Sequence, residues 1–340
     1  MRIIKSVLVL IALTLGFIAC TEDEPSKSNL NTIESFEIDF GDADPVNYEF
    51  GDDISVSVPF GTDVTGKTVT VTVSENATVE PASGSVIDFV DGESIEFKVT
   101  AENGEIKSYN VTVTIRGEVG SGSKLDTYTV EDPFRGNSTT TYKYSDESGF
   151  VIETNKSTVL FGEETKTKTT FVYDDKNQVV EEKTESGDDL GSTIYTYNTV
   201  GQIISSEYTL NDELTYTYVY TYDAIGLLLK SERTDLTDDN FKSSDEFTIE
   251  SGNVVKEINS NQESVATYDD KRNPFKPLYP SAYADINIGI QSVNENNPIS
   301  GTLSDDDIVY EYNEDGYPIS ANYTYFDGLA TVSKTYTYFE

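Results

Sequence analysis

The sequence of 340 residues contains no histidine and no tryptophan, and Cys20 is its only cysteine. Without histidine, the Ser-His-Asp and Cys-His arrangements of nucleophilic catalysis cannot be built. Zinc loses its two commonest ligands, and no disulfide can form within the chain. We therefore predict no catalytic residue, no metal site and no cofactor, and a fold stabilised by hydrogen-bonded sheets and packed side chains.

Basic residues are scarce, because 61 Asp and Glu stand against 23 Lys and Arg, which gives a formal net charge of −38. A surface this acidic repels phosphate backbones and anionic headgroups, so nucleic acid is excluded as an ordinary partner. The catalytic chemistry that stays open is carboxylate-based, as in glycosidases. Acidic residues are spread along the whole chain, however, and no pair of them stands out.

The first twenty residues have the pattern of a secretory signal that ends in a lipobox. Arg2 and Lys5 precede an apolar stretch over residues 7–18, and Ala19 stands directly before Cys20. This pattern predicts a signal peptide over residues 1–19 and an acylated Cys20 as the first residue of a mature lipoprotein. The apolar stretch is shorter than the roughly 20 residues that a transmembrane helix needs. A plain secretory signal with an incidental cysteine is the alternative.

Residues 20–29 are polar, contain Pro25, and are predicted to form a disordered tether behind the lipid. The acidic run Thr21-Glu22-Asp23-Glu24 resembles the surface-export signal of Bacteroidetes-type lipoproteins. That resemblance implies a protein of the outer membrane, held by its lipid and facing the cell exterior. The same residues also fit a solvated tether without a sorting role.

Residues 30–117 are predicted to form a small all-β domain. Apolar and polar residues alternate in segments such as 69–73 and 111–115, which is typical of half-buried strands. Asn103-Gly104 separates two such segments and predicts a two-residue hairpin turn in which both residues have positive φ. Six or seven short strands in about ninety residues favour a β-sandwich.

Turn residues of this domain follow a fixed order: Val58-Pro59, Gly61-Thr62-Asp63, Pro81 with Gly84, Asp88-Phe89, the run 99–104, and Tyr109-Asn110-Val111. The order resembles a family of immunoglobulin-like domains that lie directly behind the lipobox of many Bacteroidetes-type lipoproteins. The resemblance implies a spacer or stalk without catalytic residues. Residues 118–124, which are rich in glycine and serine, are predicted to form a flexible hinge behind it.

Nearly all of the 23 tyrosines lie in residues 125–340, where a short phrase recurs. Its copies have Asp or Asn in the second position and Gly or Asn in the fifth, and they begin at Tyr173, Tyr197, Tyr222 and Tyr312. Asp or Asn favours the first position of a type I turn, and Gly or Asn accepts the left-handed conformation that closes a bulged hairpin. The phrases together predict an antiparallel meander of roughly fourteen to eighteen strands, curled into a barrel-like or open twisted sheet.

Tyr216, Tyr218, Tyr220 and Tyr222 share one face of a predicted strand, because side chains alternate along it. Two roles fit such a face: a stacking surface for sugar rings, or a packed ladder whose hydroxyls reach a partner or water. The tyrosines follow the repeat, which favours the structural role, and these four are also the candidate ligand-binding residues. A membrane-spanning porin does not fit, because Thr, Ser, Glu and Asp occur on both faces of the strands.

The phrase resembles YD (RHS-type) repeats, for which Tyr222-Asp223 with Gly226 is the best match. The runs 268–275 and 310–318 resemble a Bacteroidetes-type lipoprotein domain of unknown function with a porin-like fold. These resemblances imply a curled antiparallel sheet with no established activity and, through the YD repeats, an association with carbohydrate binding.

Residues 274–300 contain four prolines and interrupt the rhythm of the hairpins. A short helix or a lid-like loop is expected there, and loops of this length often carry function. Asn273-Pro274-Phe275 could border a pocket, but we interpret it as a plug at the end of the sheet.

Taken together, these features predict a non-catalytic, surface-exposed lipoprotein that acts in binding or adhesion. The expected partner is a neutral glycan or a surface protein, and the membrane is contacted through the lipid alone. One alternative is a carboxylate-based glycan hydrolase, which needs two inward carboxylates roughly 5–10 Å apart. Another is a purely structural envelope protein, which a fully packed sheet interior would favour.

Overall fold

The computed structural model describes residues 26–41, 46–260, 262–301 and 307–339. The predicted signal peptide, Cys20 and the acidic run behind it therefore lie outside the described residues. Within the described part, no helix combines the length and the apolar character needed to cross a membrane. The chain forms two compact units, the first built mainly from residues 47–56 and 63–114 and the second from 57–62 and 115–340.

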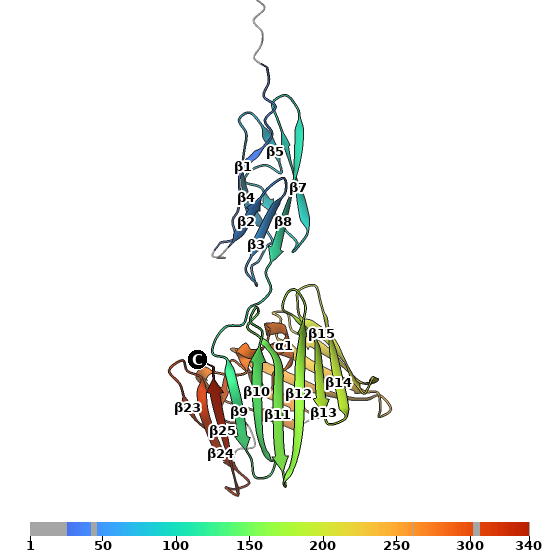
Figure 1. The fold of residues 1–340 in the computed structure, drawn as a ribbon, viewed down its shortest axis with the longest axis vertical. Helices are drawn as coiled ribbons and strands as arrows, with labels where there is room; N and C mark the ends of the chain where they lie inside the picture. Colours follow the sequence, from blue (N-terminus) through green and yellow to red (C-terminus); the bar gives the residue numbers. More distant parts are fainter. Residues whose placement is uncertain (1–25, 42–45, 261, 302–306, 340) are drawn as a thin grey trace, which may run out of the picture. The chain divides into compact units, whose positions relative to one another are not determined.

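The N-terminal strands form two small sheets (Figure 1). Their orders are β1 (Ile33–Ile38), β4 (Lys67–Val73), β6 (Val86–Ile87) in one and β2 (Asn47–Phe50), β3 (Ile54–Val58), β8 (Ile106–Ile115), β7 (Ser94–Thr100), β5 (Thr78–Glu80) in the other. Val69 and Val71 of β4 are buried while Thr68, Thr70 and Thr72 are exposed, as the alternation predicts. Phe36 of β1 and Phe97 of β7 join the sheets through an edge-to-face contact, with ring centroids 5.2 Å apart.

The hairpin turn at Asn103-Gly104 differs from the prediction. Gly104 has a positive φ of 91°, but Asn103 does not. The Asn103 Oδ1 atom accepts the Glu105 N–H at 2.9 Å, and the Ala101 N–H donates to the Glu105 carbonyl at 2.8 Å. The prediction of a two-residue turn with two left-handed residues is therefore wrong, because the Asn103 side chain stabilises a longer loop from within.

The second unit contains one antiparallel sheet of fifteen strands. Twelve consecutive neighbours are β9 (Leu125–Glu131), β10 (Asn137–Tyr144), β11 (Val151–Leu160), β12 (Glu163–Tyr173), β13 (Val179–Ser186), β14 (Asp189–Tyr197), β15 (Ile203–Leu210), β16 (Glu213–Tyr222), β17 (Leu228–Asp235), β18 (Phe241–Glu250), β19 (Asn253–Asn259) and β20 (Gln262–Val265). The remaining three are β23 (Val309–Tyr312), β24 (Pro318–Tyr325) and β25 (Ala330–Tyr338). The predicted all-β meander is confirmed.

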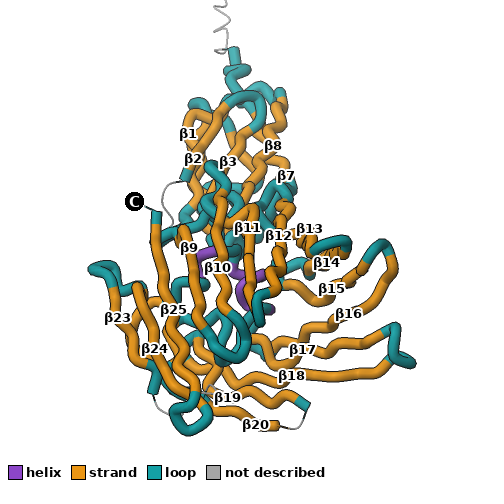
Figure 2. Tube along the Cα trace, turned by 60° about the horizontal axis from the view of Figure 1, so that its bottom comes forward, coloured by secondary structure: helices purple, strands orange, loops and turns teal. Residues whose placement is uncertain are grey.

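The end of the chain returns to the beginning of this sheet, because β25 pairs with β9. β20 and β23 are then the two edge strands, and the sheet stays open instead of closing into a barrel. Figure 2 shows how strongly it curls: β16–β20 swing round from the direction of β9–β12, and the helical segment drawn in purple lies inside the curl. Of the two predicted forms, the open sheet is the one observed.

The recurring phrase forms the predicted turns. In the copy at Tyr222, the Asp223 Oδ1 atom accepts the N–H groups of Ile225 and Leu227, both at 2.9 Å, and Gly226 has a φ of 91°. The other copies share this geometry, with Asn177 (φ 60°), Gly201 (φ 83°) and Gly316 (φ 81°) at the fifth position. A short polar side chain thus closes each turn through hydrogen bonds to residues nearby in the chain. This explains why the turns could be predicted from the sequence.

In three copies of the phrase, and in a longer variant that begins at Tyr144, the tyrosine joins its hairpin to the hairpin before it, whereas the Tyr312 hydroxyl donates to the Asp269 carboxylate. The hydroxyl donates to the carbonyl of a fully buried residue at the start of an earlier strand: Tyr144 to Leu125 at 2.7 Å, Tyr197 to Val179 at 2.8 Å, Tyr222 to Ile203 at 2.6 Å, and Tyr173 to Val151. The strand register shifts where tyrosine and buried residue meet within a hairpin, as at Tyr197 and Ile203. A bulge interrupts the backbone ladder, so the tyrosine supplies a donor that the ladder lacks there.

Residues 268–298 cross the concave face of the sheet. They contain β21 (Tyr268–Arg272), a 3₁₀ turn at Lys276–Leu278, α1 (Ser281–Ile286) and β22 (Asn296–Pro298). Phe275 packs edge-to-face on Tyr128, with ring centroids 5.1 Å apart, and against the hydrophobic core, as expected of a plug, while Asn273, Pro274 and Phe275 also border a small pocket. The buried Tyr283 of α1 donates to Glu182 at 2.6 Å, and Tyr195 donates to the same oxygen at 3.0 Å.

Residues 118–124, predicted to be a flexible hinge, make specific contacts within the second unit. The Glu118 carboxylate accepts the Ser281 N–H at 2.9 Å and the Ser281 hydroxyl at 2.7 Å. A Cβ atom at Gly120 would lie 3.0 Å from the Gly149 carbonyl carbon and oxygen. Glycine at this position therefore permits a close backbone approach.

Replacing a phrase tyrosine with phenylalanine tests the link between hairpins. We expect Tyr197→Phe to lower the free energy of unfolding by about 1–3 kcal/mol, because the Val179 carbonyl loses its donor. Tyr323→Phe is the matched control. No hydrogen bond is among the causes that shift the pKa of Tyr323, so this substitution deprives no acceptor of its donor. Urea unfolding curves measure both, and equal losses in the two variants would contradict the role given to the hydrogen bond.

Stability should fall steeply at alkaline pH. Burial raises the pKa of Tyr220 to about 12, and it raises the pKa of Tyr144, Tyr173 and Tyr197 further. The unfolded chain releases these phenol protons near pH 10 and the folded chain retains them, so unfolding becomes more favourable above that pH. Each tyrosine contributes up to about 1.4 kcal/mol per pH unit. Unfolding curves at pH 8 to 11, followed with tyrosinate absorbance, check this, and a flat profile would contradict it.

Candidate glycan-binding cleft

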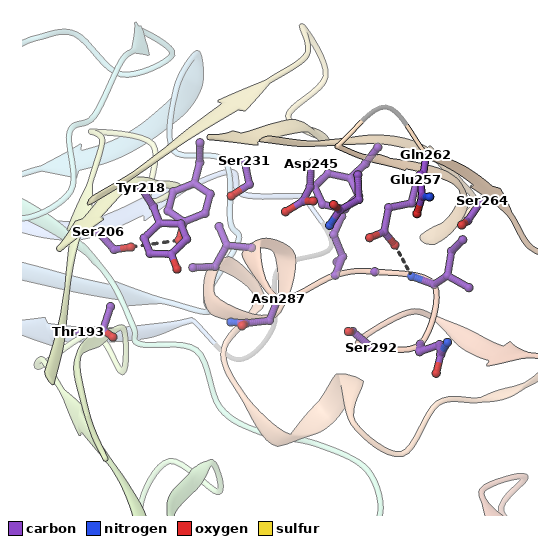
Figure 3. A pocket seen from close by; sticks show the side chains of 18 of the residues that line it. Thr193, Ser206, Tyr218, Ser231, Asp245, Glu257, Gln262, Ser264, Asn287 and Ser292 are labelled. Carbon is purple, nitrogen blue, oxygen red and sulfur yellow. Dashed lines mark hydrogen bonds between the residues drawn. The ribbon is translucent and has the colours of Figure 1, made fainter. Parts of the chain in front are cut away.

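A cleft of about 590 Å³ opens on the concave face of the second unit. Strands β14–β20 form its floor. Residues 286–292, which begin at the last residue of α1, form the opposite wall (Figure 3). Its polar lining consists of Thr193, Ser206, Ser231, Asp245, Glu257, Asn259, Gln262, Ser264, Asn287, Gln291 and Ser292. Its rings belong to Tyr195, Tyr208, Tyr218, Tyr220 and Phe247. The cleft therefore offers hydroxyl, amide and carboxylate groups beside aromatic faces.

Strand register places the polar groups side by side. One row of direct cross-strand partners consists of Tyr220, Ser231, Asp245, Asn259 and Gln262. The next row consists of Phe247, Glu257 and Ser264. Direct partners in an antiparallel pair share a face and have Cβ atoms about 4.5–5.5 Å apart. The two rows thus form a continuous strip across five strands.

Two of the four predicted tyrosines line the cleft. The rings of Tyr218 and Tyr220 are nearly parallel, with an interplanar angle of 8° and centroids 6.4 Å apart. Tyr220 is fixed by a hydrogen bond of 3.1 Å with the Ser206 hydroxyl and packs against the hydrophobic core. Tyr218 is not part of that core, and Figure 3 shows it beside Ser206 at one end of the cleft. Its ring is the aromatic surface best placed for a ligand.

The other two predicted tyrosines lie outside the lining. Tyr216 stacks on Tyr208 with ring centroids 5.7 Å apart. Tyr222 donates its hydroxyl to the Ile203 carbonyl and belongs to the links between hairpins. The structure therefore separates the predicted set, with Tyr218 and Tyr220 in the cleft and Tyr216 and Tyr222 in packing roles.

Asp245 and Glu257 carry the negative charge of the cleft lining. The direct partner of Asp245 on the next strand is Asn259, so Glu257 lies diagonally opposite, as a neighbour about 7–8 Å away whose Cβ atom is somewhat closer. Burial raises the pKa of Asp245, the charge of Glu257 raises it further, and Arg233 partly offsets both. Glu257 also accepts the Ile290 N–H at 3.1 Å, which ties the loop wall to the floor (Figure 3).

Sequence analysis did not identify Asp245, Glu257 or the wall at residues 286–292 as functional. Alternation along each strand gives the face of these acids, but only the register of β16–β20 shows that they meet. The interruption at residues 274–300 is the one signal that points toward the wall. Among the described residues, no group of three or more Cys, Asp or Glu lies close enough to hold a metal ion.

Residues 33–113 match a family model described as SGBP, N-terminal, the N-terminal domain of surface glycan-binding proteins. The match supports a binding protein at the cell surface, and it includes none of the residues that line the cleft. None of the curated proteins matches the chain.

Solved structures from Bacteroides are similar to parts of the chain. A porin-like protein from Bacteroides uniformis is 14% identical, covers 66% of this chain and 100% of its own, and has a TM-score of 0.43. A DUF4623 family protein from Bacteroides eggerthii is 10% identical, covers 91% of this chain and 99% of its own, and has a TM-score of 0.24.

Removing the Glu257 carboxylate should loosen the loop wall. We expect Glu257→Ala to speed amide hydrogen exchange at Ile290 at least tenfold, because that N–H loses its acceptor. Glu257→Gln keeps an oxygen at the same position and should leave exchange close to that of the unmodified protein. Mass spectrometry of exchanged peptides covering residues 286–292 measures both, and unchanged exchange in Glu257→Ala would show that the bond does not hold the loop.

Proposed function

We propose that this protein is a non-catalytic lipoprotein that binds neutral glycan at the cell surface through the cleft on its tyrosine-rich sheet. Cys20 carries the lipid and anchors the chain to the outer membrane, facing outward. Residues 30–117 act as an immunoglobulin-like stalk, residues 118–124 as its hinge, and residues 125–340 as the YD-like binding domain. The match of residues 33–113 to surface glycan-binding proteins supports the surface location and the ligand class.

The lining of the cleft is the observation that carries this proposal. The face of a sugar ring is apolar and its rim carries hydroxyls, so glycan sites pair an aromatic surface with donors and acceptors at its edge. Tyr218 supplies the surface, and the row Ser231, Asp245, Asn259 and Gln262 supplies the polar edge. None of these groups is positively charged, which favours an uncharged glycan over a sulfated or uronic one.

Two alternatives start from observations in the same unit. Asp245 and Glu257 face one cleft as diagonal neighbours about 7–8 Å apart, which is compatible with a carboxylate-based hydrolase. The packed part of the concave face fits a purely structural envelope protein. Such a protein would not need the open cleft beside it. A surface protein as ligand differs from a glycan in needing a larger contact area than the cleft offers.

Removing the Tyr218 ring tests the proposal. We expect Tyr218→Ala to weaken binding of a neutral oligosaccharide at least tenfold, because stacking on an aromatic ring is lost. Tyr216→Ala is the matched control, since Tyr216 lies on the same strand face but outside the lining. A glycan array with the mature chain selects the ligand, and titration calorimetry measures the affinities.

The outcome also separates the alternatives. If no neutral glycan binds, or if Tyr216→Ala weakens binding as much as Tyr218→Ala, the proposed role of the cleft is wrong. Chromatography of the glycan after prolonged incubation detects cleavage. New reducing ends that disappear in Glu257→Gln would replace the binding function with the hydrolase.

A further inference from the structure

The lysines of β16–β20 all lie on the face of the sheet opposite the cleft. The cleft residues of β17–β19 are odd-numbered (Ser231, Asp245, Glu257), whereas the lysines of β16–β20 are even-numbered and point away from them. There they pair with glutamates: Lys230 and Lys242 with Glu232 at 3.2 and 2.7 Å, and Lys256 with Glu263 at 2.7 Å. Glu232 and Glu263 on the convex face thus have lysine partners, whereas neither acid of the cleft forms an ion pair with a lysine of these strands.

Arg233 is the one basic residue of the described β16–β20 that shares the face of the cleft. It does not line the cleft, and its guanidinium lies over the Tyr216 ring at 4.9 Å from the centroid. Arg233 also interacts with the Tyr218 hydroxyl, and through it lowers the pKa of that phenol, which burial raises. The arginine weakens the negative potential at Asp245 without occupying the space between the two acids.

We propose that the cleft prefers a glycan carrying a protonated amino group, an amino sugar, with this group held between Asp245 and Glu257. The inference rests on the proposed function, because the cleft is the site and the two acids only set its charge preference. An ammonium group is compact and offers three donors, so it satisfies two carboxylates at once. Its charge removes the repulsion between them, and the ring beside it stacks on Tyr218 while its hydroxyls meet Ser231 and Gln262.

A metal ion fits this pair of acids less well than an ammonium group. Calcium takes six to eight oxygen ligands, and the described residues contain no group of three acids that could supply the core of such a site. A sulfated or uronic sugar would add negative charge beside two carboxylates in a partly dehydrated cleft. Of the charged glycans, only a cationic one gains from both acids.

The test compares two oligosaccharides of equal length that differ only in the amino group, glucosamine oligomers and N-acetylglucosamine oligomers. Titration calorimetry is done with the mature protein at a pH that keeps the amine protonated and the carboxylates ionised. We expect the amino form to bind at least tenfold more tightly. Asp245→Asn and Glu257→Gln should each remove most of that preference, and Glu257→Gln retains an acceptor for the Ile290 N–H.

Glu246→Gln is the matched control, because Glu246 follows Asp245 in the chain, is exposed, and points to the convex face. It removes the same charge and should leave the preference unchanged, and circular dichroism verifies that all three variants fold. An equal loss in Glu246→Gln would mean that overall charge, and not the cleft, sets the preference.

The remaining outcomes distinguish failure of this inference from failure of the proposed glycan-binding function. Tyr218-dependent binding of the N-acetylated form without any preference for the amino form would overturn the inference and leave glycan binding intact. Absence of binding to either oligosaccharide and to the neutral glycan array would overturn both. A rise in melting temperature with calcium chloride that Asp245→Asn abolishes would assign the two acids to a metal ion instead.

Discussion

The hydrogen bond from a strand-end tyrosine to the carbonyl of an earlier hairpin is the interaction on which the second unit depends. A two-stranded hairpin is marginally stable by itself in water. Here a hairpin donates its tyrosine hydroxyl to a fully buried carbonyl of the hairpin before it, as Tyr197 does to Val179 and Tyr222 to Ile203. The bond acts at the bulges, where the backbone ladder is interrupted, so it stabilises the positions at which a long meander would otherwise fray.

This constraint also decides which tyrosines are available to a ligand. Tyr197, at the end of β14, has its hydroxyl bound to a carbonyl and its ring packed against the core. A tyrosine in the middle of a strand is not required for the link, and Tyr218 is of this kind. The plug fills the apolar part of the concave face, where Phe275 and Tyr283 meet rings of the sheet. The plug does not cover the strip of β16–β20, which faces residues 286–292 across the open cleft.

Sequence analysis anticipated the features that are encoded locally. The turn at Asp223 is determined by residues within four positions, so its hydrogen bonds and the φ of Gly226 followed from composition. Features that depend on distant segments did not follow: nothing near Tyr338 shows that β25 pairs with β9, and nothing near Asp245 shows that Glu257 lies beside it. Asn103 shows that even a local rule fails when a side chain has two ways to stabilise a turn.

The effect of the acidic residues differs between the composition as a whole, the convex face of the sheet and its concave face. As composition, it excludes nucleic acid and says nothing about a site. On the convex face, lysines on neighbouring strands neutralise individual acids; Glu153, beside Lys143 and Lys168, has its pKa lowered to about 2. On the concave face, burial and mutual repulsion raise the pKa of Asp245, because no lysine of β16–β20 reaches it. Functional charge in a very acidic protein is therefore recognised by the absence of a partner and not by the density of acids.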